Sequence, residues 1–314
     1  MSYDFTASPS SQDWASLLDR TFARCEGAYA DITLRGYRYD LDIFARWCDD
    51  NDCEFLPASP AGVAAFVDDM LARYSYATIK RRIAAIQFAH RLTDLPSPVS
   101  SSDVYLSLRR AGRTKGRRPK QVRGLTSGLL EQILHACPQT LPGTRDAALI
   151  SVGYDTLCRS AELAWMEVGH IDLASQTVYI PRSKNDPFGD GRIAGLSNRS
   201  TEIVGRWLDE AALDDGPLFR GLHTAKLGSG HLETSSIRRL IKVAAKRAGL
   251  ADAAAELSGH SMRVGGAQDL MTSGFDTLAI MTAGGWKNVE VVARYVEKAA
   301  LSRREHPLGT RLSV

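Results

Sequence analysis

Residues 258–300 read SGHSMRVGGAQDLMTSGFDTLAIMTAGGWKNVEVVARYVEKAA, and this stretch decides the fold of the end of the chain. Its apolar residues recur with helical spacing, and glycines interrupt it at Gly274 and at the pair 284–285. Asp276 and Asn288 are residue types that cap helix N-termini, and each follows a glycine break. These signals predict three short helices, over residues 262–273, 276–282 and 288–300.

Four side chains in this stretch carry chemistry that a site could use. His260 and Arg263 stand three positions apart at a helix start, so both can point to one side of a first turn whose dipole favours anions. The glycine pair 265–266 would let that helix approach a neighbour closely. The spacing predicts that two helix ends bring four residues within reach of one another: His260, Arg263, Trp286 and Tyr295.

Three charged residues that could belong to the same site lie upstream. Arg159 and Glu162 are one helical turn apart in YDTLCRSAELAWMEV, and Lys184 follows a predicted strand in a turn. Taken singly, each has an ordinary interpretation: an exposed ion pair and a solvated lysine, just as Trp286 and Tyr295 could be packing residues. The sequence has no Gly-x-Ser-x-Gly, P-loop or His-Glu-x-x-His motif and no carboxylate cluster, which argues against those hydrolase, nucleotide and metal sites.

The length of 314 residues suits two domains, and 44% hydrophobic with 24% charged residues is typical of a globular protein. No stretch approaches the roughly 18 apolar residues of a membrane span, and the N-terminus does not resemble a signal peptide. Five scattered cysteines indicate reduced thiols. We therefore expect a cytoplasmic protein without a membrane partner.

The net charge of +3 conceals a strong asymmetry along the chain. Residues 1–69 contain 5 basic and 13 acidic residues, residues 70–124 contain 13 basic and 2 acidic ones, and the rest is balanced. The segment RRAGRTKGRRPKQVRG, residues 109–124, alone holds eight cations. Its interpretation as a solvated hinge competes with that of a strap along a phosphate backbone, and the eight cations favour the strap.

Apolar periodicity divides the chain into four parts. We expect a disordered tail over residues 1–12, an all-helical domain over 13–110, a basic extended linker over 111–124 and a mostly helical domain over 125–314. In the first domain, helices are predicted around residues 14–25, 34–48, 60–74, 76–92 and 102–110. In the second, a small β section is predicted over residues 168–172, 177–182 and 192–197, and helices around 126–137, 143–157, 199–213 and 235–248. The fold class is thus mainly α, with a small antiparallel sheet.

Together, the chemistry-bearing residues of 258–300 and those upstream at positions 159 and 184 resemble the pattern of the tyrosine recombinase (phage integrase) family. The family pattern is Arg in a helix, Lys on a β-turn, His-x-x-Arg, His or Trp, and then Tyr nine residues on. This sequence presents all six in order: Arg159, Lys184, His260, Arg263, Trp286 and Tyr295. The resemblance covers the second domain in detail and the first only in its architecture.

The residue types suit attack on a phosphodiester, which builds negative charge on the non-bridging oxygens. Arg159 and Arg263 can each fork onto phosphate oxygens, and Trp286 can donate its indole N–H. Tyr295 would lose a proton and hold the 3′ phosphate covalently.

Three more roles complete the site in this interpretation. His260 is the candidate base or a phosphate hydrogen-bond donor, and Lys184 is the candidate acid for the departing 5′ oxygen. By resemblance, Glu162 would orient the site. No metal, ATP or other cofactor is expected, because the cations supply the positive charge.

The resemblance implies site-specific DNA recombination on double-stranded DNA with inverted-repeat sites. A dimer would occupy each site, and a homotetramer would join two sites and exchange strands through a Holliday junction. The tail, residues 299–314, would dock on a neighbouring subunit or be frayed. Two alternatives stay open: a type IB topoisomerase-like or resolvase-like strand transferase, and a catalytically silent DNA-binding regulator on the same scaffold.

Three basic groups are the expected DNA contacts. They come from the helix 76–92, from the basic segment that begins at residue 109, and from the helix 235–248. The residues are Lys80, Arg81 and Arg82; Arg109, Arg110, Arg113, Lys115, Arg117, Arg118 and Lys120; and Arg238, Arg239 and Lys242.

Overall fold

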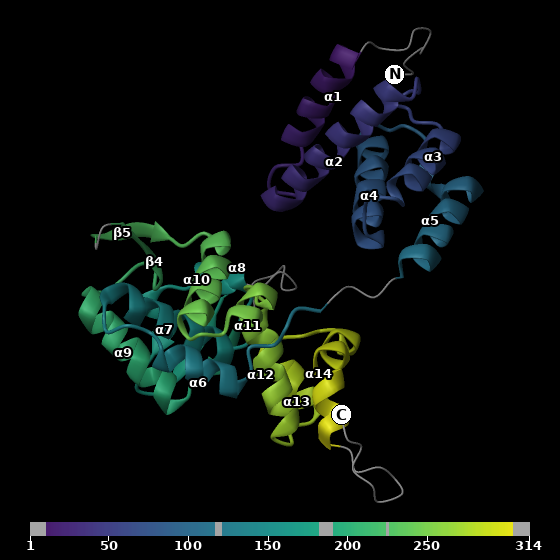
Figure 1. The fold of residues 1–314 in the computed structure, drawn as a ribbon. Coiled ribbons are helices and arrows are strands. Elements are labelled where there is room, and N and C mark those ends of the chain that lie inside the picture. Colours follow the sequence, from purple (N-terminus) through teal and green to yellow (C-terminus); the bar gives the residue numbers. More distant parts are fainter. Residues whose placement is uncertain (1–10, 117–120, 182–190, 224–225, 304–314) are drawn as a thin grey trace, which may run out of the picture. The chain divides into compact units, whose positions relative to one another are not determined.

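The computed structural model describes residues 11–116, 121–181, 191–223 and 226–303, and the chain divides into two units, residues 1–120 and 121–314. The first unit is built from α-helices, and the second combines α-helices with two small sheets (Figure 1). Among the described residues, no helix is long and apolar enough to cross a membrane.

Five α-helices form the first unit, as the apolar stripes predict. They are α1 (Ser11–Ala23), α2 (Asp31–Asp50), α3 (Pro60–Met70), α4 (Tyr76–Leu92) and α5 (Ser102–Lys115). Serines at positions 59, 75 and 101 cap α3, α4 and α5, each accepting a backbone N–H from the first turn. Phe44 of α2 and Phe66 of α3 lie 4.8 Å apart, ring centre to ring centre, in a core that also buries Ile79 and Ile83 of α4.

Two predicted boundaries in this unit are wrong. Helix α1 begins at Ser11, inside the expected disordered tail; residues 1–10 lie outside the described part. Helix α5 continues to Lys115, so the linker does not begin at residue 111. Burial of Ala111 against the helical core and the good helix propensity of Arg and Lys explain the extension, and Gly116, with φ of 71°, ends it.

The second unit holds nine α-helices among the described residues. They are α6 (Ser127–His135), α7 (Leu141–Asp155), α8 (Ser160–Ala164), α9 (Asn198–Ala211), α10 (Thr234–Arg247), α11 (Ala251–Glu256), α12 (Ser261–Thr272), α13 (Thr277–Gly284) and α14 (Val289–Arg303). Helix α7 is buried nearly all round and forms the centre of the core. Trp207 of α9 is fully buried, and its indole N–H donates to the Leu218 carbonyl at 2.9 Å.

The β structure is more extensive than the sequence indicates. The predicted strands are present in shorter form as β1 (Ile171–Asp172), β2 (Thr177–Ile180) and β3 (Arg192–Gly195), an antiparallel sheet in the order β1-β2-β3. A second antiparallel pair, β4 (Arg220–His223) and β5 (Lys226–His231), was not predicted. Its strand KLGSGH has two glycines and no apolar alternation, so the usual strand signal is absent.

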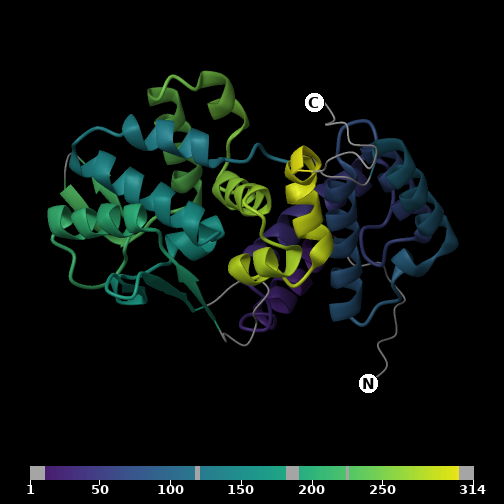
Figure 2. The same ribbon diagram turned by 90° about the horizontal axis from the view of Figure 1, so that it is seen from below.

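The three helices predicted from residues 258–300 are all present and pack together (Figure 2). Asp276 caps α13, Gly285 ends it with φ of 64°, and Asn288 accepts the Glu290 N–H at 2.7 Å at the start of α14. A Cβ at Gly265 of α12 would collide with the backbone of Leu125, so this helix approaches its neighbour as closely as the glycine pair predicts.

Candidate active site

The side chains predicted to meet come from three places in the second unit. Arg159 is the N-cap of α8, and His260 precedes α12, which carries Arg263 in its first turn. Trp286 lies between α13 and α14, and Tyr295 is in the middle of α14. Helix α12 packs against both α7 and α14, so it is the element that brings these side chains together.

His260 and Tyr295 form the central contact. Their Nε2 and Oη atoms are 2.7 Å apart, with the two rings nearly perpendicular. Burial, and then the positive charges of Arg263 and Arg159, lower the pKa of His260 to about 4, so the ring is neutral at physiological pH. Burial raises the pKa of the Tyr295 hydroxyl, which is therefore protonated. The phenol consequently donates its hydrogen bond to a neutral imidazole.

Arg263 is fully buried beneath Trp286. Its guanidinium carbon lies 3.9 Å from the centre of the Trp286 ring system, and its Nη1 donates to the Leu157 carbonyl. Its Nε and Nη2 have no hydrogen-bond partner among the described residues. Burial lowers the pKa of Arg263 to about 10, with the charge of Arg159 contributing, so it stays cationic at neutral pH. Two charged donors thus lack an acceptor at the centre of the site.

Arg159 is tied to Glu162 rather than free in solvent. Its Nη1 lies 2.5 Å from Glu162 Oε1, and its backbone N–H donates to Oε2 at 3.0 Å. The Glu162 side chain is only 3% exposed, so the alternative interpretation of an exposed ion pair does not hold. Arg159 is also the N-cap and not an interior residue of the helix. The capping geometry fixes the carboxylate, which in turn fixes the guanidinium.

Trp286 completes the described cluster, with its ring centre 5.9 Å from that of Tyr295. The predicted convergence of His260, Arg263, Trp286 and Tyr295 is therefore confirmed as geometry. Lys184 lies outside the described residues.

Arg192 is a member of this site that the sequence did not reveal. From β3 it donates to the carbonyls of Thr156, at 2.7 Å, and Ala283, at 2.9 Å, and it lies 3.9 Å from Glu162. It therefore links the segment before Arg159 to the end of α13, next to Trp286. No motif marks such a residue, because its partners come from distant parts of the chain.

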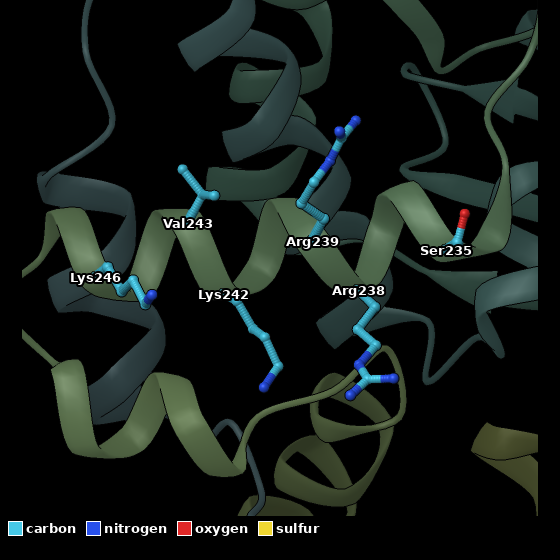
Figure 3. Close-up of a pocket in the computed structure, with 6 residues that line it drawn as sticks. All are labelled: Ser235, Arg238, Arg239, Lys242, Val243 and Lys246. Atoms are coloured by element: carbon cyan, nitrogen blue, oxygen red, sulfur yellow. The ribbon is translucent and has the colours of Figure 1, made fainter.

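Four basic residues of α10, Arg238, Arg239, Lys242 and Lys246, line a hollow of about 320 Å³ (Figure 3). Arg238 and Lys242 project along one edge of the helix, and Arg239 and Val243 along another. Arg238 and Arg239 are exposed, whereas Lys242 is half-buried and donates to the Ala255 carbonyl at 2.9 Å. The buried residues of α10 face the core, so its cations form an outward basic surface.

In α5 the basic residues fall on the exposed side. Arg113 and Lys115 are exposed, as is Arg109, which donates to the Tyr105 hydroxyl at 2.9 Å. Arg110 pairs with Asp68 at 3.1 Å while remaining 57% exposed. The expected contacts Arg117, Arg118 and Lys120 lie outside the described residues.

In α4 the prediction of three outward cations is wrong for Arg82. Its side chain is 4% exposed, lies over the Tyr74 ring at 4.0 Å and is 3.5 Å from Asp40. Arg81 is half-exposed and donates twice to the same buried carboxylate, at 2.7 and 2.8 Å. Lys80 is exposed. The buried Asp40 of α2 needs cationic partners, which explains why α4 turns an arginine inward.

The chemistry available to this arrangement can be read from its charges. Cationic donors converge on one place, beside a phenol that already donates to a neutral imidazole. Such a site can stabilise an oxyanion and accept a proton from the phenol.

Both units match families of known proteins. Residues 123–301 match the phage integrase family, and residues 23–92 match the phage integrase N-terminal SAM-like domain. The second match extends the family likeness to the first unit, where the sequence alone indicated only a shared architecture.

Curated relatives cover most of the chain. The integrase/recombinase xerD homolog of Selenomonas ruminantium is 30% identical over 88% of this chain and 84% of the relative. Recombinase cre of Escherichia phage P1 is 30% identical over 81% of this chain and 80% of the relative.

Solved structures share the fold. XerH recombinase bound to a palindromic difH substrate has a TM-score of 0.66 and 17% identity, over 91% of this chain and 81% of that chain. A lambda integrase tetramer bound to a Holliday junction has a TM-score of 0.63 and 15% identity, over 96% of this chain and 80% of that chain.

Proposed function

Because the chain belongs to the phage integrase family, we propose that it is a tyrosine-type site-specific recombinase that cuts and rejoins DNA through a covalent 3′-phosphotyrosine. The observation that carries this proposal is the 2.7 Å contact between His260 Nε2 and the Tyr295 hydroxyl beside the buried Arg263. It pairs a nucleophile with a base next to donors for the charge that attack creates.

The arginines bind the scissile phosphate. Arg159 and Arg263 fork onto its non-bridging oxygens, which supply acceptors for the unpaired Nε and Nη2 of Arg263. Trp286 lies over Arg263, so its indole N–H is available as a further donor to the phosphate. Glu162 and Arg192 hold the arginine cluster in position.

The reaction conserves bond energy. Tyr295 Oη forms a bond to phosphorus as His260 accepts its proton, and the bond from phosphorus to the 5′ oxygen breaks. Lys184 protonates that oxygen, which leaves as a hydroxyl. A second 5′-hydroxyl attacks the phosphotyrosine in reverse, so religation needs no ATP. Arg159, Arg263 and Lys184 supply the positive charge.

Basic surfaces in both units support binding of duplex DNA. In α10, Arg238 and Arg239 are exposed, and in the first unit Lys80, Arg113 and Lys115 are exposed. We assign to this chain a dimer on each inverted-repeat site and a tetramer that joins two sites. The likeness to the lambda integrase tetramer bound to a Holliday junction supports that assembly.

The nucleophile can be tested by trapping the adduct. A target site is first selected from random inverted-repeat DNA with the purified protein, and a nicked version that loses its short 5′-hydroxyl fragment is then supplied. We expect wild type to form a covalent protein–DNA adduct and Tyr295→Phe to form none. Tyr179→Phe, an exposed tyrosine of β2, is the matched control and should react normally. Cleavage by Tyr295→Phe would overturn the assignment.

The general acid requires a separate test. Lys184→Ala should cleave ordinary DNA slowly but regain its rate on DNA with a 5′-phosphorothiolate, because a thiolate leaves without a proton. Absence of rescue would remove this role from Lys184.

A second test distinguishes a recombinase from a topoisomerase-like enzyme. A recombinase should bring two duplex sites together in one complex, whereas a topoisomerase-like enzyme should act on a single duplex.

A further inference from the structure

The backbone carbonyl of Tyr295 accepts hydrogen bonds from two side-chain amides. Gln121 Nε2 donates to it at 3.3 Å and Gln268 Nε2 at 3.1 Å. Tyr295 lies within α14, so these amides reach the interior of a helix from outside it. The carbonyl and the phenol belong to one residue, so what fixes the carbonyl also restricts the hydroxyl.

Gln268 connects the nucleophile to the rest of the site. It lies on α12, the helix that carries Arg263 and begins next to His260. Its side chain packs on the backbone of Gly124 so closely that a Cβ there would collide with its amide oxygen. This packing limits the rotamers of Gln268. The hydrogen bond from Gln268 thus fixes the backbone of Tyr295 to α12, the helix that also positions His260 and Arg263.

Gln121 connects the nucleophile to the start of the second unit. It is the first residue of that unit, and the chain after it is held on α12: the Leu125 N–H donates to the Ser261 carbonyl at 2.8 Å. Arg123 pairs with Glu256 at 3.2 Å on the way. Gln121 therefore joins this anchored segment at the start of the second unit to the backbone of Tyr295.

We propose that Gln121 and Gln268 are positioning residues, an amide clamp that aligns Tyr295 with His260 and Arg263. The inference rests on the proposed nucleophilic role of Tyr295. Gln268 supplies the fixed arm of the amide clamp. Gln121 supplies the second arm, from the start of the second unit. Both amides donate to the Tyr295 carbonyl, so we expect loss of the amide clamp to slow the covalent step at saturating DNA.

The size of the effect follows from geometry. Misplacement of a reacting group by about 1 Å can cost about 100-fold in rate. Loss of one arm leaves the other, so we expect about a tenfold loss for Gln268→Met and less for Gln121→Met. Methionine matches glutamine in length but has no donor. Gln132→Met is the matched control, because Gln132 Nε2 also donates to a backbone carbonyl, Gly128, at 3.0 Å, within α6.

Two measurements test the amide clamp. The first is amide hydrogen exchange of residues 289–303 in the DNA-free protein, which should be faster in both clamp variants and unchanged in Gln132→Met. The second is single-turnover adduct formation at saturating nicked DNA, measured with DNA affinity. Gln121→Lys keeps a donor at similar reach and should cleave faster than Gln121→Met. If Gln268→Met does not fold, Gln121→Met and its lysine counterpart decide the question.

The outcomes distinguish failure of the amide clamp from failure of the proposed recombinase function. Adduct rates for the folded methionine variants within twofold of wild type would overturn the amide clamp while leaving the recombinase assignment intact. Absence of any adduct with wild type would overturn the proposed function. Slower adduct formation at saturating DNA in the methionine variants, with the rate restored in Gln121→Lys, supports the amide clamp.

Discussion

Arg82 in the first unit and Arg263 in the second occupy environments that look alike. Both side chains are almost completely buried, and both guanidinium groups lie about 4 Å from the centre of an aromatic ring, Tyr74 and Trp286 respectively. The difference is in their partners. Arg82 is 3.5 Å from the carboxylate of Asp40, and its Nε has no hydrogen-bond partner among the described residues. Arg263 has no carboxylate as close; it donates to a backbone carbonyl, and two of its nitrogens lack a partner among those residues.

The comparison shows that burial of a cation does not by itself indicate function. Arg82 balances a buried negative charge, which is a structural role. Arg263 sits near two other cations, Arg159 and Arg192, and Glu162 offsets that charge only in part. An excess of positive charge at a buried point is a site for an anion. The charge of the neighbouring groups, and not burial itself, therefore separates a structural arginine such as Arg82 from a site residue such as Arg263.

Arg263→Met should produce the larger effect on chemistry. Removing a donor from the developing phosphate charge should slow single-turnover adduct formation by about 1000-fold. Stability should change little, because loss of the Trp286 contact and of the Leu157 hydrogen bond is offset by the removal of two buried donors that lack acceptors among the described residues. Adduct kinetics and thermal unfolding together check this. A lower unfolding temperature with a retained adduct rate would make Arg263 a structural residue like Arg82.

Arg82→Met should show the opposite pattern. It removes an ion pair and a ring contact, but Arg81 still neutralises Asp40, so we expect the free energy of unfolding of the first unit to fall by about 2 kcal/mol. The adduct rate at saturating DNA should stay within about twofold of wild type. Urea denaturation gives the first value. Unchanged stability with weaker DNA binding would restore Arg82 to the DNA contacts.

The local signals of residues 258–300 predicted the three helices that bring His260, Arg263 and Tyr295 together. Asp276, Gly285 and Asn288 end or begin helices by rules that need only neighbouring residues. The spacing of His260 and Arg263 follows from one helical turn. Their contact with Tyr295 required only that short helices fold back on each other.

Other features depended on distant partners. Arg82 is three residues after Ile79 and four before Ile86, which places it on the buried face of α4, yet its charge suggested the surface. Only Asp40, on another helix, makes that burial possible. The roles of Arg192 and Gln268 likewise depend on carbonyls that are remote in sequence. Such partners are fixed by packing and leave no pattern.

Two histidines extend the comparison to pH. His90 accepts the Ala58 N–H at 2.9 Å as His260 accepts the Tyr295 hydroxyl, and burial lowers the pKa of both. Below pH 6.5 the unfolded chain binds more protons than the folded one, so stability is lost as pH falls, down to about pH 4 for His260.

In the second unit, the loss of stability on acidification between pH 6.5 and 4 should therefore be smaller in His260→Gln than in wild type, by about 3 kcal/mol. Hydrogen exchange across that range can follow each unit separately. His90→Gln is the matched variant and should flatten the first unit only. An unchanged pH dependence in His260→Gln would mean that the imidazole is not held neutral.

The smallest expected effect is on DNA affinity, in a variant of Lys80, the exposed counterpart of Arg82 on α4. Lys80 is two residues away on α4 but points to solvent, so Lys80→Ala should leave stability unchanged. If Lys80 neutralises a phosphate, DNA affinity falls severalfold, and the slope of log affinity against log salt becomes shallower by about 1. Arg82→Met should leave that slope as it is, because a cation held by Asp40 releases no counterion when DNA binds. Equal slopes for wild type and Lys80→Ala would remove Lys80 from the DNA-binding surface.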